Sequence, residues 1–286
     1  VRHYSYQRRD ICIMVVLMFF LFGKPYKRGF FCNDESLMHP YHSSTVTSAM
    51  LYVTGLFLPI STVSHLYLSL SNELYYIFQV GIFGFGAATT VLVTDVAKYT
   101  IGRLRPHFMM LCVPDINCTL PVNHYRYIED FTCTAPNISP KLLKEMRLSF
   151  PSGHSSFSAY TMIYLAIYLQ LRITWKGSKL LKHILQITCI LMAWFTAMSR
   201  ISDYKHHWSD VLAGSLLGSI IALIVVRKLF LFIFPLCPKS PKLKSSMFTM
   251  FILCHSYRNH SYSRYFFSQL KYLLSHFLSF SLFLSP

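Results

Sequence analysis

The sequence predicts an all-α integral membrane protein, a bundle of about six transmembrane helices. Of the 286 residues, 53% are hydrophobic and only 13% are charged, whereas a soluble domain carries about 25% charged residues. Apolar segments close to the length of about 20 residues that a helix needs to cross a bilayer recur along the chain. The net charge is +16, but many basic residues flank these segments and no nucleic-acid recognition motif is present. We therefore expect a membrane as partner and no nucleic acid.

Six segments are predicted to span the bilayer. Segment 11–22 is apolar but short, so a signal peptide is an alternative for it, although no small-residue cleavage site follows. The other five predicted spans are longer and cover 45–66, 74–96, 155–171, 183–199 and 211–226, the last with an extension to 234. Together these segments predict one six-span domain over 11–234.

The two ends of the chain differ from this domain. The chain starts with Val1 rather than Met, and 1–10 is interpreted as a cytosolic segment that is truncated or non-native. The tail 235–286 starts with a basic, proline-containing stretch and then becomes apolar and aromatic at 247–254 and 265–284. A seventh span, an interfacial helix or non-native sequence are the alternatives for this atypical tail. We expect the tail to be cytosolic, without a catalytic role.

The distribution of positive charge predicts the orientation of the bundle. Lys and Arg cluster before the first span, between the fourth and fifth spans at 172–182, and after the last span at 227–244. The positive-inside rule places these regions in the cytosol. The loops 97–154 and 200–210 then face the extracellular side or an organelle lumen.

Two glycosylation sequons test this orientation. Asn117 and Asn137 each begin an Asn-x-Ser/Thr triplet, and both lie in the loop 97–154. Glycosylation occurs on the non-cytosolic side, so both asparagines are predicted acceptors. A third sequon, at Asn259 in the tail, should stay unmodified.

Cysteines on the predicted outer side are candidates for disulfides, because an oxidising compartment permits them. These residues are Cys32, Cys112, Cys118 and Cys133. Sequence alone leaves their pairing open. Cys12 and Cys189 are interpreted as small, buried apolar residues.

Lys98 and Arg105 form the first stretch with recognisable chemistry. They are seven residues apart, which places them on nearly one face of a helix, with Gly102 between them leaving room for a ligand. Pro106 disfavours helix at Arg105, so the helix should end there. A basic cluster at the membrane interface is the alternative, and Asp95 is placed to pair with Lys98. The positive-inside rule disfavours cations on the outer side. Their presence there therefore favours a functional pair that binds one anion.

The second stretch, Pro151-Ser152-Gly153-His154, predicts the start of a helix. Ser152 suits the N-cap position, and a long apolar segment follows. Free N–H groups at a helix N-terminus bind phosphate, and Gly153 lets an anion approach the backbone. His154 would point to the same place. Ordinary capping beside an interfacial histidine is the alternative.

The third stretch carries a histidine and a carboxylate one helical turn apart. Asp210 follows His206 by four residues, so it can hold one ring nitrogen and leave the other as a nucleophile. Arg200 offers a planar fork that matches phosphate oxygens. Asp203 and His207 show the same spacing, so one of the two histidines is expected to be a filler.

A metal site is the alternative for this third stretch, with His206, His207 and Asp210 as ligands. Adjacent histidines on one helix diverge by about 100°. They are therefore poorly placed to share one ion, and we predict no metal.

The three stretches, Lys-x6-Arg-Pro, Pro-Ser-Gly-His and Ser-Arg-x5-His-x3-Asp, resemble the three-part signature of the type 2 phosphatidic acid phosphatases, the PAP2 superfamily. Within it, the chain is similar to the animal lipid phosphate phosphatases (phospholipid phosphatases), which include the insect Wunen-like proteins. The resemblance covers about 11–230, and its supporting segments are Lys27–Asp34, Lys98–Phe108, Pro151–Ser156 and Ser199–Gly214.

The resemblance implies a mechanism. His206 attacks phosphorus and forms a phosphohistidine, Asp210 orients its ring, and His154 protonates the leaving alcohol. The x5 spacing selects His206 over His207. The residues implied to hold the phosphate are Lys98, Arg105, Ser152, Gly153 and Arg200, with Ser199, Pro106 and Pro151 in support.

The resemblance also implies substrates and surroundings. Phosphatidate, lysophosphatidate, ceramide-1-phosphate and sphingosine-1-phosphate are the family's substrates, hydrolysed without a cofactor or metal, so lipid phosphates are expected partners. The expected location is the plasma membrane, with the endoplasmic reticulum or Golgi as alternatives, and the expected active site is extracellular or lumenal. A homo-oligomer is a possible state, and Gly214-Ser-Leu-Leu-Gly218 permits close helix packing.

Three other functions are weighed against this one. A catalytically inactive, lipid-binding relative should lack His154, Arg200 or His206, and all three are present. A transporter should carry ionisable residues deep inside its spans, whereas here they cluster at one predicted face. A relative specific for sugar phosphates or sphingoid phosphates is disfavoured by the similarity of Lys27–Asp34.

Overall fold

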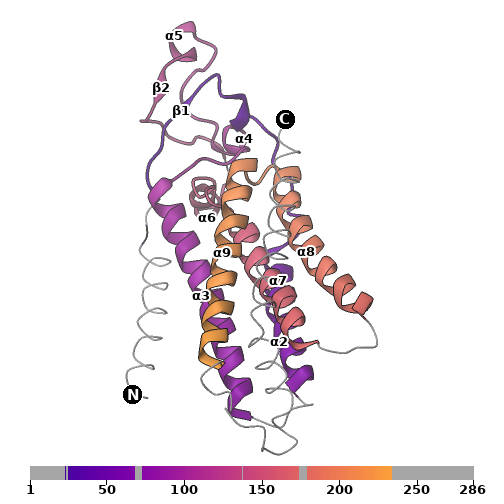
Figure 1. The fold of residues 1–286 in the computed structure, drawn as a ribbon. Coiled ribbons are helices and arrows are strands. Elements are labelled where there is room, and N and C mark those ends of the chain that lie inside the picture. The colour runs from indigo at the N-terminus through magenta and orange to yellow at the C-terminus, as the bar shows by residue number, and fades with distance from the viewer. Residues whose placement is uncertain (1–22, 24, 68–72, 137, 174–178, 234–286) are drawn as a thin grey trace, which may run out of the picture.

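Five long helices form a bundle, and the short elements gather at one end of it (Figure 1). The structure, a computed structural model, describes residues 23, 25–67, 73–136, 138–173 and 179–233. Within these residues the long helices are α2 (Ser48–Tyr67), α3 (Glu73–Ile101), α7 (Gly153–Arg172), α8 (Lys179–Ser202) and α9 (Trp208–Ile233). They correspond to the five longer predicted spans. Segment 11–22 and the tail 235–286 lie outside the described residues.

Three of the described helices are long and apolar enough to cross a bilayer. These segments are Ile77–Ile101, Leu180–Ser202 and Trp208–Arg227. The helical membrane class is thus confirmed, while six spans stay a prediction. Helix α7 is less apolar because it lies at the centre, in contact with α2, α3, α8 and α9. Most of α7 is buried. Several of its hydroxyls donate to backbone carbonyls within the helix, as Thr161 Oγ1 does to the Phe157 oxygen, whereas the Tyr160 hydroxyl donates to the Phe83 oxygen of α3.

Helices α7 and α9 pack closely through two glycines of α9. A β-carbon at Gly214 would collide with the Ser152 carbonyl oxygen, and one at Gly218 with the Ser156 carbonyl oxygen. The predicted close packing of Gly214-Ser-Leu-Leu-Gly218 is therefore confirmed, within the chain. This contact fixes the start of α9 against the start of α7.

Helix α3 ends earlier than the sequence predicted. Its last residue is Ile101, and Gly102 adopts a left-handed conformation with φ +59°, as is common for a helix C-terminal glycine. A side chain at Gly102 would collide with the Tyr26 backbone. The prediction that Lys98 and Arg105 share a helix face was wrong, and the space beside Gly102 accommodates the Tyr26 segment rather than a ligand.

The short elements form what we call the cap module, residues 25–45 and 103–150. Its strands β1 (Phe30–Phe31) and β2 (Tyr127–Ile128) pair antiparallel, with Phe30 opposite Ile128. Its helical elements are η1 (Glu35–Leu37), α4 (Phe108–Cys112), α5 (Pro121–His124) and α6 (Pro140–Glu145). The module covers the bundle end where α3 and α8 finish and α7 and α9 begin (Figure 1).

Two disulfides and a small apolar core hold the cap module together. Cys32 pairs with Cys118, and Cys112 pairs with Cys133, which settles the pairing that the sequence left open. Phe30, Phe108 and Met146 are among the buried residues around them. Cys189 is free and buried in the bundle, as predicted.

Candidate active site

The three sequence stretches meet where the cap module joins the bundle. The backbone N–H of Ser152 donates to the Asp210 carbonyl oxygen at 2.9 Å, which joins the second stretch to the third. The N–H of Ser149 donates to the Arg103 oxygen at 3.0 Å, and the N–H of Arg105 to the Met146 oxygen at 2.9 Å. These bonds bring the first stretch to the second. Residues more than 100 positions apart thus line one site.

His206 lies in the short turn between α8 and α9 and is 4% exposed. Its N–H donates to the Arg200 carbonyl oxygen at 3.2 Å, which closes the turn. Burial lowers the pKa of His206 well below its usual value, and the positive charges of Arg105 and Lys98 lower it further. The imidazole is therefore neutral at neutral pH, which is the form that a nitrogen nucleophile requires.

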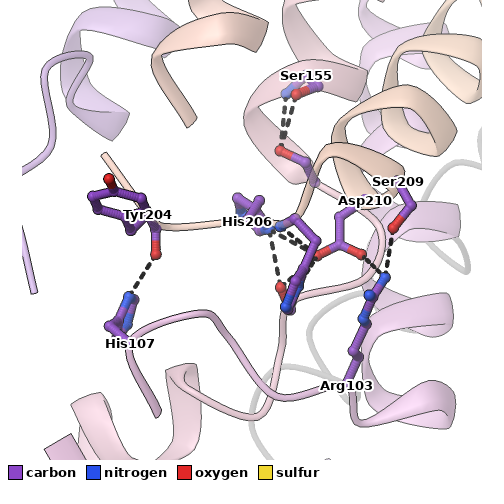
Figure 2. Close-up of polar contacts among 10 residues, drawn as sticks. Arg103, His107, Ser155, Tyr204, His206, Ser209 and Asp210 are labelled. Atoms are coloured by element: carbon purple, nitrogen blue, oxygen red, sulfur yellow. Dashed lines mark hydrogen bonds and ion pairs between the residues drawn. The ribbon is translucent and has the colours of Figure 1, made fainter. Parts of the chain in front are cut away.

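Asp210 is the centre of a buried hydrogen-bond network at the start of α9 (Figure 2). Its Oδ1 pairs with Arg103 Nη1 at 2.5 Å, and its Oδ2 accepts from Ser149 Oγ at 2.6 Å. His207 lies closer to Asp210 Oδ2 than His206 does, with Nδ1 at 3.2 Å against 3.9 Å. The predicted pairing of Asp210 with His206 is thus not a direct hydrogen bond here.

Ser149 bridges His206 and Asp210. Its hydroxyl lies 3.5 Å from His206 Nδ1 while donating to Asp210 Oδ2, and the Ser149 backbone also hydrogen-bonds the His206 ring. Sequence reasoning missed both Ser149 and Arg103. Arg103 was visible as a third cation beside Lys98 and Arg105, but nothing near Ser149 in the sequence indicated its role.

The carboxylate of Asp203 holds Arg200 in place. In the sequence, Asp203 was noticed only for its four-residue spacing from His207. The Arg200 side chain donates from Nη2 to Asp203 Oδ2 at 2.9 Å and to Ser199 Oγ at 3.2 Å. Asp203 in turn accepts from the N–H and the hydroxyl of Thr45, at 2.8 Å and 2.7 Å. Asp203 therefore positions Arg200 and ties the segment before α2 to the site, and Ser199 supports the same guanidinium group.

Lys98 and the start of α7 lie side by side. Ser152 caps α7, as predicted, by accepting from the N–H and hydroxyl of Ser155 (Figure 2). A β-carbon at Gly153 would lie 2.8 Å from Lys98 Nζ, so the ammonium group sits against the helix N-terminus. Lys98 also pairs with Asp95 at 3.4 Å, as the sequence indicated. A cation and free helix N–H groups thus face one small volume, which favours an anion.

Two buried nitrogen atoms in this volume have no hydrogen-bond partner among the described residues: Arg105 Nε and His154 Nε2. Such atoms are rare in folded proteins and call for a ligand or another explanation. The Val46 backbone hydrogen-bonds the His154 ring, so this bond engages Nδ1 and leaves Nε2 for the site. Burial also lowers the pKa of Arg105.

Pro106 and Pro151 act through the backbone. The Pro106 carbonyl oxygen accepts from the His39 N–H at 3.1 Å, and Pro151 precedes the Ser152 cap.

Within the described residues, no group of three or more His, Cys, Asp or Glu side chains is arranged to hold a metal ion.

One predicted glycosylation site can be examined. Asn117 is exposed on the cap module, and its Oδ1 accepts from the Thr119 N–H at 3.0 Å and the Thr119 hydroxyl at 2.6 Å. Asn137 lies outside the described residues.

Comparisons with known proteins identify a family that this chain resembles. The model of the PAP2 superfamily matches residues 79–233. The chain is 39% identical over 238 residues to phospholipid phosphatase 2 of Mus musculus, and the alignment covers 76% of this chain and 83% of that protein. It is 40% identical over 242 residues to phospholipid phosphatase 1 of Rattus norvegicus, with coverage of 76% and 81%.

A protein of Drosophila melanogaster named "Putative phosphatidate phosphatase" is 51% identical over 241 residues. The alignment covers 74% of this chain but 64% of that protein, less than two thirds of its length. No solved structure matches the chain.

Proposed function

Because the chain belongs to the PAP2 superfamily, we propose that it is an integral-membrane lipid phosphate phosphatase. It hydrolyses the phosphate monoester of lipids such as phosphatidate, lysophosphatidate, ceramide-1-phosphate or sphingosine-1-phosphate, through a phosphohistidine and without a metal. One observation supports this most: a buried, neutral His206 lies near the positive charges of Lys98 and Arg105 and near the His154 ring. The catalytic domain is 11–234.

In the first step, His206 Nε2 attacks phosphorus. The nitrogen–phosphorus bond forms as the ester bond breaks, and the alkoxide leaving group takes a proton from His154 Nε2. Because Nδ1 of His206 faces Ser149 and Asp210, Nε2 is the nitrogen available for attack. A dianionic phosphate beside His154 favours the protonated ring that this step requires.

In the second step, His154 accepts a proton from water, and the resulting hydroxide attacks phosphorus. The nitrogen–phosphorus bond breaks, and His206 is released neutral. Lys98, Arg105 and Arg200 stabilise the negative charge on the phosphoryl oxygens in both transition states. The N–H groups at the start of α7 add to this stabilisation.

We place the site on the extracellular or lumenal face, with the plasma membrane as the host membrane. Two disulfides in the cap module support an oxidising compartment. The lipid chains then remain in the bilayer while the phosphate reaches the end of the bundle.

The mechanism is tested by phosphate release from lysophosphatidate in detergent micelles. His206→Ala should lower kcat by more than about 1000-fold, since the nucleophile is lost. His183→Ala, at an exposed position of α8, is the matched control and should keep wild-type activity. Full activity of His206→Ala, or loss of wild-type activity with a chelator, would contradict the proposal.

The orientation is tested by glycosidase treatment of protein made in eukaryotic cells. A shift in gel mobility is expected for the wild type and for Asn259→Gln. It should disappear in the double variant Asn117→Gln and Asn137→Gln. A shift that is lost with Asn259→Gln instead would reverse the proposed orientation.

A further inference from the structure

Lys205 is a buried cation beside the site that the three sequence stretches do not include. It lies between Arg200 and His206 in the turn from α8 to α9, and its N–H donates to the Arg200 carbonyl oxygen at 3.0 Å. The residue is 5% exposed. Its Nζ lies 3.6 Å above the centre of the Tyr41 ring. A cation–π contact of this kind holds an ammonium group without neutralising its charge.

In the part of the chain that the structure describes, most of the cations around the site contact a carboxylate, and two do not. Among the described residues, Lys98 pairs with Asp95, Arg103 with Asp210, and Arg200 with Asp203. Arg105 and Lys205 make no ion pair in this part of the chain, although Glu145 acts on both from a longer distance.

Two positive charges that contact no carboxylate, and that Glu145 offsets only from a distance, match in number the two negative charges of a phosphate monoester dianion. Burying unpaired cations is costly, so a site that keeps two of them is expected to bind an anion. The charge balance therefore indicates that Lys205, like Arg105, is available to bind the anionic substrate.

The surroundings of Lys205 fix its position. The His107 and Tyr41 rings make a T-shaped contact at 5.1 Å between centroids, and His107 Nδ1 donates to the Tyr204 carbonyl oxygen at 2.8 Å. Tyr204 also stacks on His39 at 4.4 Å. The His107 ring therefore supports the Tyr41 ring, and its hydrogen bond to Tyr204 links both to the turn that carries Lys205.

We propose that Lys205 is a further phosphate-binding residue, which contacts the dianionic head of the lipid substrate and is positioned by the Tyr41 ring. This inference rests on the proposed function and adds a residue outside the three stretches to it. Tyr41 contacts Lys205 rather than the substrate, so it is a positioning residue.

Charges around Lys205 give the inference a pH signature. The groups that act on it are Arg105, Arg200, Asp203 and Glu145, and burial together with the two arginines lowers the pKa of Lys205 to about 8. Its charge is therefore present below pH 8 and is lost as the pH rises through this value. The free enzyme should lose kcat/KM above pH 8 for the same reason.

The experiment compares Lys205→Met, Lys205→Arg, Tyr41→Leu and Tyr41→Phe in full-length, detergent-solubilised protein with lysophosphatidate as substrate. Lys205→Met should raise KM, and the inhibition constant of inorganic phosphate, by about 10- to 100-fold, the usual effect of one charged hydrogen bond. Tyr41→Leu should raise KM by about 3- to 10-fold, because the cation–π contact is lost. Tyr41→Phe keeps the ring and should match the wild type.

Lys205→Arg provides the decisive measurement, because arginine stays charged at all accessible pH values. The decline of kcat/KM near pH 8 should move above pH 9 in this variant. A decline that remains near pH 8, or an unchanged KM in folded Lys205→Met, overturns the inference while leaving the phosphatase function intact. Absence of phosphate release from any lipid phosphate by the wild type contradicts the proposed function instead.

Discussion

The helix bundle and the cap module are stabilised in different ways, and the candidate site lies on their boundary (Figure 1). The bundle relies on apolar packing around α7, with a core that includes Phe83, Tyr160 and Ala222. The cap module has two strands of two residues each and short helical elements among its described residues, and two disulfides cross-link it. A small, loop-rich unit buries too little apolar surface to fold on packing alone.

Each region supplies a different part of the site. The bundle provides helix ends, which position Lys98, Gly153 and Arg200, and the turn that carries His206. The cap module provides Ser149 and Arg103, which surround Asp210, and also Arg105. The reacting groups are therefore rigidly placed by helices, while their partners depend on disulfide-linked loops. Substitutions in the two regions should therefore have different effects on folding, stability and activity.

The largest expected effect comes from the bundle. Gly218→Leu would force a side chain into the Ser156 backbone of α7, and overpacking of this kind should cost more than about 4 kcal/mol. Little monodisperse protein should appear in fluorescence-detected size-exclusion chromatography. Gly81→Leu in α3 is the matched control, because no atom beyond the adjacent residues and the backbone of its own helix turn lies within 4 Å of the added β-carbon. Equal behaviour of the two variants would contradict the close α7–α9 packing.

The disulfides of the cap module should differ in importance. Cys32–Cys118 spans 86 residues and Cys112–Cys133 spans 21. Chain-entropy arguments then give about 4.6 and about 3.3 kcal/mol for their contributions to stability. Replacing both cysteines of a pair by serine should lower the temperature of inactivation more for Cys32–Cys118. The reverse order would show that strain or residual structure, rather than loop length, determines the effect.

A smaller effect is expected at the boundary itself. Ser149→Ala removes the hydroxyl between His206 and Asp210, and kcat should fall by about 10- to 100-fold with KM nearly unchanged, since no substrate contact is lost. In an Asp210→Asn background the same substitution should have little further effect, because both residues act on His206 as a unit. Ser158→Ala, at a buried serine within α7, is the control. Additive effects of Ser149→Ala and Asp210→Asn would show that Ser149 does not act through Asp210.

Features that depend on residues close in the sequence could be predicted, and features that depend on distant segments could not. The Ser152 cap, the Asp95–Lys98 pair and the buried Cys189 depend on neighbours within one helix, or on residue type, and were predicted correctly. Arg105 was misplaced because the left-handed turn at Gly102 accommodates Tyr26, a contact from a distant segment.

The cap module was harder to predict because its contacts are almost all long-range. Four cysteines with no local constraint allow three pairings, and only the fold chooses among them. The roles of Ser149, Asp203 and Lys205 arise from Asp210, Thr45 and Tyr41, residues brought near them by tertiary structure. Sequence therefore indicated the chemical groups of the site more completely than the network that holds them.

The smallest expected effect is a pH dependence of stability at the boundary. Burial lowers the pKa of His107 to about 4, the positive charges of Arg105 and Lys205 act in the same direction, and the hydrogen bond to the Tyr204 carbonyl opposes them. The unfolded chain, with a pKa near 6.5, binds a proton below that value while the folded state does not. Stability is therefore complete above pH 6.5 and decreases as the pH falls toward 4, by about 1 kcal/mol at pH 5.5.

His107→Asn tests this dependence, because the amide can keep the hydrogen bond to the Tyr204 carbonyl without titrating. Thermal unfolding in detergent should show a smaller loss of stability between pH 7 and pH 5.5 in this variant than in the wild type. Part of the loss should remain, since His206 is also buried with a lowered pKa and acts in the same direction. An identical pH dependence in variant and wild type would contradict the assignment of part of this acid sensitivity to His107.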